Sequence, residues 1–122
     1  LTALAIVRSE EGERRREELT SAVHALRHGL TGRNADVMGA PSPVVPVFIG
    51  RDDVARFAAR LLLQAGIITN LVEYPAVSRA TARFRLQVMS THARAACDTA
   101  ASRVATAIAE ARTLCARRSD AA

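Results

Sequence analysis

The sequence predicts a two-layer α/β sandwich in which helices cover one face of a small sheet. Two long segments, one near each end, carry apolar residues at helical spacing. Between them, short apolar runs that suit strands flank one further helix. The predicted order is therefore helix, strand, helix, strand, strand, helix. With 122 residues, 49% of them apolar, the chain can bury one modest core.

The first helix is predicted over residues 3 to 30. Gly12 marks a weak point or kink in it, and Gly29 and Gly32 can end it because glycine commonly follows a helix. The side chains that recur on one face of this helix are Leu19, Val23, Leu26 and Leu30.

The middle of the chain is predicted as a strand followed by a second helix. Val44 to Ile49 suits a strand, and Pro46 predicts an edge or bulged position because proline cannot donate to a sheet. Asp52 or Asp53 then caps the helix, which Gly66 ends. Its core-facing stripe consists of Val54, Phe57, Ala58, Leu61 and Leu62.

Two more strands are predicted over Ile67 to Val72 and Thr81 to Met89, with a turn or loop around Pro75 between them. In the later strand, apolar residues alternate with polar ones. One face is therefore apolar, and the other can hold an anion through its arginines. The apolar face consists of Phe84, Leu86 and Val88, and the polar face of Arg83, Arg85 and Gln87.

The last helix is predicted from a cap at Ser90 or Thr91 to about Cys115, with a frayed tail after it. Cys97 and Cys115 on one helix would lie about 27 Å apart, which excludes a disulfide between them. Unpaired thiols fit a reducing cytoplasm. His24 and His28 share a helix face, but without a third ligand they predict no metal site.

The net charge of +5 comes with arginine as the sole permanently basic residue type, since the chain contains no lysine. Arg14, Arg15 and Arg16 lie among glutamates, which predicts a solvated mixed face rather than a nucleic-acid site. Aromatic residues are 3% of the chain, too few for base stacking. No apolar run approaches the roughly 18 residues of a membrane span. Without lysine, this chain cannot hold a cofactor aldehyde as a Schiff base.

Three stretches occur in a familiar order: SPVVPVFIG, a helix ending in LLLQAGI, and EYPAVSRATARFRLQVMSTH. Together they resemble the C-terminal domain of the α-oxoamine synthases, enzymes that use pyridoxal phosphate (PLP). The resemblance covers roughly residues 1 to 114 and is most specific from Ser42 to Asp98. It implies the small, mainly antiparallel α/β domain of fold type I PLP enzymes.

The resemblance also implies site residues. The second arginine of the family's R-x-R pair binds the carboxylate of the amino-acid substrate, and here it is Arg85, while Arg83 is expected to be structural or solvent-facing. Tyr74 either lines the substrate entrance or packs the turn. Several members carry a further arginine where this chain has Glu73. Glu73 could recognise a positive group or simply be solvated, and we expect it to be solvated. His92 is expected to support the loop and cap rather than catalysis.

For the parent enzyme, the resemblance implies condensation of an amino acid with an acyl thioester, carried by coenzyme A or a carrier protein. PLP would be bound by a large domain absent from this chain, which starts on Leu1 and is expected to be part of a longer cytoplasmic, homodimeric protein. Residues 1–33 would lead in from that domain, 34–116 would form the small domain, and 117–122 the tail. No catalytic or cofactor-binding residue is expected here, so the chain alone would be inactive.

Two other functions are compatible with the sequence. The chain could be a free-standing interaction or dimerisation module that kept the fold and lost catalysis. It could also be an arginine-rich binder of anions or nucleic acid.

Overall fold

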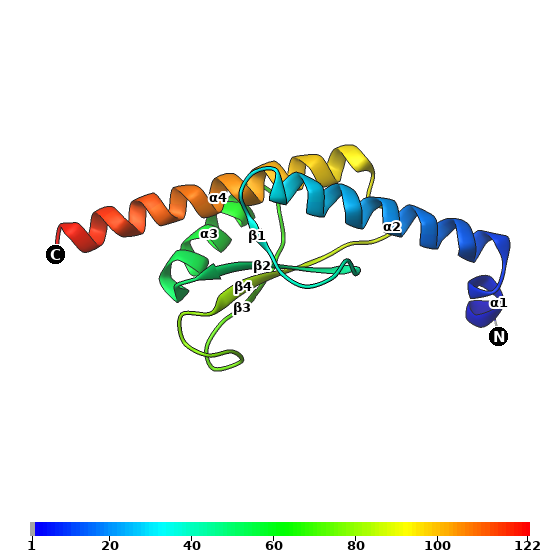
Figure 1. Cartoon of the computed structure of the whole chain (residues 1–122), viewed down its shortest axis with the longest axis horizontal. Coiled ribbons are helices and arrows are strands. Elements are labelled where there is room, and N and C mark those ends of the chain that lie inside the picture. Colours follow the sequence, from blue (N-terminus) through cyan, green and yellow to red (C-terminus); the bar gives the residue numbers. More distant parts are fainter. Residues whose placement is uncertain (1) are drawn as a thin grey trace.

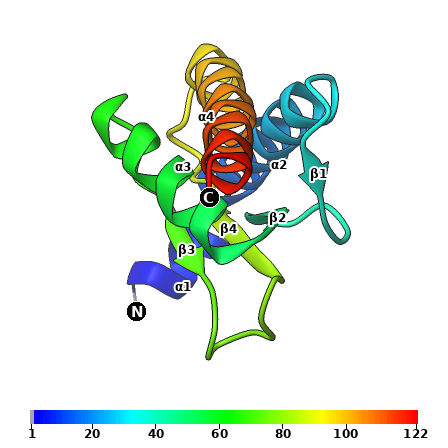
Figure 2. The same cartoon turned by 90° about the vertical axis from the view of Figure 1, so that its left-hand side faces the viewer.

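The computed structural model describes residues 2–122 and arranges them in two layers (Figure 1). One layer is a four-stranded sheet, and the other consists of helices α2, α3 and α4 on one side of it (Figure 2). The predicted two-layer fold with a small antiparallel sheet is confirmed. The elements are α1 (Thr2–Val7), α2 (Glu10–Thr31), β1 (Asp36–Val37), β2 (Val44–Gly50), α3 (Asp52–Gln64), β3 (Asn70–Val72), β4 (Ala82–Gln87) and α4 (Arg94–Asp120).

The strand order in the sheet is β1-β2-β4-β3, so β4 lies between β2 and β3. Its apolar residues point toward the helices and are buried, as the alternation predicts. The two-residue strand β1 was not predicted, because a strand this short has no period to detect. The largest side chains without solvent exposure are Phe84, Leu30, Leu62, Val45, Val47 and Val104.

Pro46 does not place β2 at an edge, so that prediction is wrong. β2 pairs with both β1 and β4, and its register irregularity lies further on, between Phe48 and Gly50. The oxygen of Pro46 accepts a hydrogen bond from the amide of Met38 (2.9 Å), which Pro46 cannot return. The guanidinium of Arg27 donates to the oxygen of Met38 instead, at 3.2 Å.

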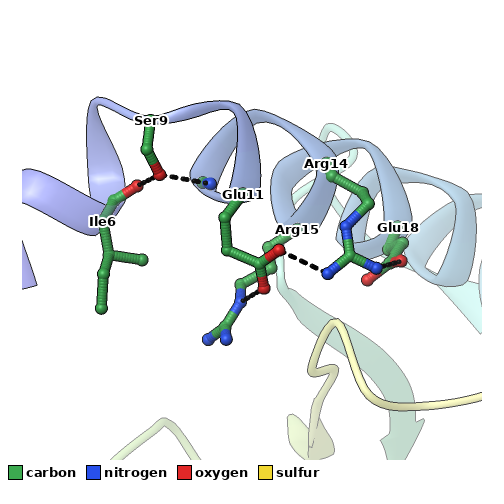
Figure 3. A network of polar contacts seen from close by, with 7 residues as sticks. Ile6, Ser9, Glu11, Arg14, Arg15 and Glu18 are labelled. Carbon is green, nitrogen blue, oxygen red and sulfur yellow. Dashed lines mark hydrogen bonds and ion pairs between the residues drawn. The ribbon is translucent and has the colours of Figure 1, made fainter.

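The N-terminal helix is broken, but at Ser9 rather than at Gly12. The hydroxyl of Ser9 donates to the oxygen of Ile6 and accepts from the amide of Gly12, which caps α2 (Figure 3). A β-carbon on Gly12 would lie 2.2 Å from the oxygen of Ile6. The glycine is therefore needed for the sharp corner between α1 and α2, although the break precedes it.

Gly29 does not end α2, which continues to Thr31 with Gly32 as its C-cap. Gly29 is buried instead where α2 packs on α4, opposite Ala101. Gly66 follows α3 with a φ of +79°, which is the position predicted for it.

The predicted caps of the other two helices are wrong. α4 begins at Arg94 after the N-cap residue Ala93, which makes no side-chain cap bond, so neither Ser90 nor Thr91 caps it. The N-cap residue of α3 is Arg51, and both aspartates lie within its first turn.

α4 continues to Asp120, beyond the predicted end near Cys115. Both cysteines lie on α4 and are free, as predicted, and both are buried. Burial raises the pKa of the Cys97 thiol. The proposed division of the chain into lead-in helix, small domain and tail stays a prediction.

Candidate carboxylate-binding site

Arg85 lies on β4, near the middle of the sheet, and its side chain is exposed on the face away from α2, α3 and α4. Its register partners are Pro46 on β2 and Asn70 on β3. A side chain on an interior strand has its backbone held by ladders on both sides. The sheet therefore fixes the base of this guanidinium more firmly than a loop would.

Within residues 2–122, the Arg85 guanidinium makes no hydrogen bond or ion pair, whereas Arg14, Arg15, Arg51 and Arg56 are all paired with acids. It borders a depression of about 200 Å³. The other residues that line this depression are Ile68, Thr69, Asn70, Gln87 and Met89. A planar guanidinium with free N–H groups in an open depression can take a carboxylate through two parallel hydrogen bonds.

The walls of this depression include two exposed apolar side chains. Ile68 is 88% exposed and Met89 is 56% exposed. These two side chains offer apolar surface that a ligand bound in the depression can cover.

Arg83 lies on the same face of the sheet as Arg85, the open face that α2, α3 and α4 do not cover, but it is half-buried. Its Nε donates to the oxygen of Thr81 at 3.2 Å. Part of its hydrogen-bonding capacity is therefore used within the turn, in keeping with the structural role expected for it.

The turn after β3 holds Tyr74, whose peptide bond to Pro75 is cis. The guanidinium of Arg79 lies over the Tyr74 ring, 4.2 Å from its centroid. Tyr74 is 48% exposed and does not line the depression around Arg85. The structure thus places it in a contact within the turn, apart from Arg85.

Glu73 is paired rather than solvated, so that expectation is wrong. Its Oε2 accepts from Nε of Arg56 on α3 at 2.8 Å, and its side chain is only 27% exposed. The hydrogen bond to Glu73 raises the pKa of Arg56. Sequence reasoning could not find this pair because its members are far apart in the chain and only the packing of α3 on the sheet brings them together.

His92 supports the loop between β4 and α4, as predicted, but it does not cap α4. Its Nδ1 accepts a hydrogen bond from the amide of Met89 at 3.2 Å. The same histidine and Cys97 border a largely apolar cavity of about 240 Å³ next to α4.

Among residues 2–122, no three His, Cys, Asp or Glu side chains gather in a way that could hold a metal ion. None of the helices in that range is both long enough and apolar enough to cross a bilayer. Because the chain has no lysine, its residues do not fit covalent attachment of PLP.

The chain matches a family model and several curated relatives. The family model "Aminotransferase class I and II" matches residues 2–104. The 8-amino-7-oxononanoate synthase of Citrifermentans bemidjiense is 32% identical over 101 residues, which cover 83% of this chain and 26% of the relative. The 8-amino-7-oxononanoate synthase of Geobacter metallireducens is 36% identical over 94 residues, which cover 76% of this chain and 24% of the relative.

Solved structures show the same fold. A serine palmitoyltransferase from S. paucimobilis with a bound PLP-myriocin aldimine superposes with a TM-score of 0.81 at 22% identity, covering 92% of this chain and 28% of that one. The 8-amino-7-oxononanoate synthase of Francisella tularensis superposes with a TM-score of 0.67 at 14% identity, covering 78% of this chain and 28% of that one.

The fold is thus that of a domain of fold type I PLP enzymes. The chain belongs to the aminotransferase class I and II family and, within it, to the α-oxoamine synthases. It spans about a quarter of the length of the curated relatives that it matches.

Proposed function

We propose that this chain is the C-terminal domain of a PLP-dependent C-acyltransferase and binds the carboxylate of the amino-acid substrate. The parent enzyme would condense that amino acid with an acyl thioester delivered by coenzyme A or a carrier protein. The observation that carries the proposal is the unpaired guanidinium of Arg85, held by an interior strand on the open face of the sheet.

The chemistry of the site follows from this placement. A bidentate ion pair fixes both oxygens of the substrate carboxylate and thereby the direction of the bonds at its Cα. Holding the reacting carbon in one orientation lowers the entropy that must be lost in the reaction. In the parent enzyme, PLP supplies the electron sink, whereas this chain supplies charge and orientation.

The remaining parts of the proposal concern the whole protein. A large domain would hold PLP through its own lysine, and the active enzyme would be a cytoplasmic homodimer. The 122-residue chain alone would neither bind PLP covalently nor turn over. After PLP is added to it, we expect no stable absorbance of a protein-bound imine, and the appearance of that absorbance would contradict this part of the proposal.

The direct test is Arg85→Ala in the full-length enzyme. We expect kcat/KM for the amino acid to fall by a factor equivalent to about 2–4 kcal/mol of transition-state stabilisation, because the substrate carboxylate would lose its cationic partner. Arg85→Lys should recover little of the loss, since an ammonium lacks the planar fork. Arg60→Ala, an exposed arginine on α3, is the control. Unchanged kinetics in Arg85→Ala would remove this residue from the site.

A further inference from the structure

Both register partners of Arg85 lack charge. Pro46 lies opposite it on β2, and Asn70 lies opposite it on β3. Side chains that oppose each other in an antiparallel pair project from the same face, with their β-carbons about 4.5–5.5 Å apart. The carboxamide of Asn70 is therefore within reach of the guanidinium, and both line the same depression.

The open face of the sheet holds its acids away from Arg85. None of the side chains that β2, β3 and β4 place on this face is acidic. These side chains are Val44, Pro46, Phe48, Asn70, Val72, Arg83, Arg85 and Gln87. Asp36 lies on the edge strand β1, opposite Phe48. Because β2 lies between β1 and β4, Asp36 is two strand spacings, or about 10 Å, from β4. Glu73, directly after β3, is bound by Arg56.

This arrangement has a consequence for binding. Opposite charges that face each other across two strands attract, so an acid at position 70 would occupy the guanidinium in the empty site. An incoming carboxylate would then have to displace it. A neutral amide leaves the cation available, and its N–H groups can donate to the same carboxylate.

We infer that Asn70 is a second residue of the carboxylate site. It keeps Arg85 unpaired in the empty site and donates an amide hydrogen bond to the bound carboxylate. The inference rests on the proposed function, in which that carboxylate belongs to the amino-acid substrate.

The test is Asn70→Asp in the PLP-loaded full-length enzyme. The two side chains have nearly the same shape, so the change adds one negative charge opposite Arg85. We expect KM for the amino acid to rise at least tenfold, with kcat changed less than threefold and KM for the acyl donor unchanged. Asn70→Leu, which lacks the amide but adds no charge, should raise the same KM about threefold.

The matched control is Asn34→Asp. Asn34 is also exposed, and it follows α2 in a left-handed conformation that aspartate tolerates. Its kinetics should equal those of the unchanged enzyme. Thermal unfolding of each variant shows whether the fold is retained.

A double-mutant cycle separates the two proposals. In an Arg85→Ala background, Asn70→Asp should raise KM by a smaller factor than it does in the unchanged enzyme, because no cation remains for the new carboxylate to occupy and only the loss of the amide donor and the added charge are left. If Arg85→Ala raises KM while Asn70→Asp and Asn70→Leu do not, the role of Asn70 is refuted and the proposed function stands. If Arg85→Ala leaves KM unchanged, the proposed function itself fails.

Discussion

Gly29 of α2 and Ala101 of α4 lie in direct contact. A β-carbon built on Gly29 would be 2.8 Å from the β-carbon of Ala101, closer than two such atoms can lie. α4 packs against both α2 and α3 (Figure 2), and this contact limits how closely α2 and α4 approach each other within the helix layer.

Gly29→Ala should therefore destabilise the protein, although alanine is the better helix former. The helix preference favours alanine by about 1 kcal/mol, whereas overpacking a buried contact costs about 1–3 kcal/mol. We expect a net loss of up to about 2 kcal/mol in the free energy of unfolding, measured by denaturant titration. The exchange variant Gly29→Ala with Ala101→Gly should recover most of it. A gain in stability for Gly29→Ala alone would show that the helices can separate at no cost.

Gly12→Ala should act locally rather than globally. The new β-carbon would meet the oxygens of Ile6 and Val7, so α1 must swing away from the start of α2. Since α1 contains no buried residue, we expect little change in the midpoint of thermal unfolding. Amide hydrogen exchange should instead speed up over the corner between α1 and α2. A large fall in the unfolding midpoint would mean that this corner supports the core.

Ala80→Gly should stabilise the turn between β3 and β4. Ala80 has a φ of +60°, a left-handed conformation that costs a residue with a β-carbon about 1–2 kcal/mol. Glycine removes this cost but loses more chain entropy on folding, so we expect a gain of about 0.5–1 kcal/mol. Ala76→Gly in the same turn, where φ is not positive, is the control and should be neutral or destabilising. Equal effects of the two changes would contradict this account.

The first turns of α2 should loosen in acid. The pKa of Glu11 lies below its ordinary value, because hydrogen bonds from Arg14 and then Arg15 favour the carboxylate (Figure 3). A carboxyl group with a lowered pKa contributes stability that is present above its unfolded pKa of about 4.3 and is lost as pH falls through its folded pKa.

We therefore expect the protection of amides in this part of α2, relative to the exchange rate of an unstructured chain at the same pH, to fall below about pH 4, through the range of the folded pKa. Glu11→Gln should show the faster exchange already at neutral pH. Glu13→Gln, which alters another acid of the same turn, is the control. An unchanged exchange rate in Glu11→Gln would show that the pairs with arginine do not hold the turn.

Apart from β1 and the break at Ser9, the sequence alone determined where the helices and strands lie and which face of β4 is apolar, because these follow from periods of 3.6 and 2 residues along the chain. It also singled out Arg85 through that alternation and through the family motif. Only the tertiary structure decided that Asn70 opposes Arg85, that Arg56 binds Glu73 and that Gly29 packs on Ala101. Strand register and helix packing bring together residues that are distant in the chain. Periodicity along one segment does not show which residue of another segment lies opposite, so these pairs could not be predicted from the sequence.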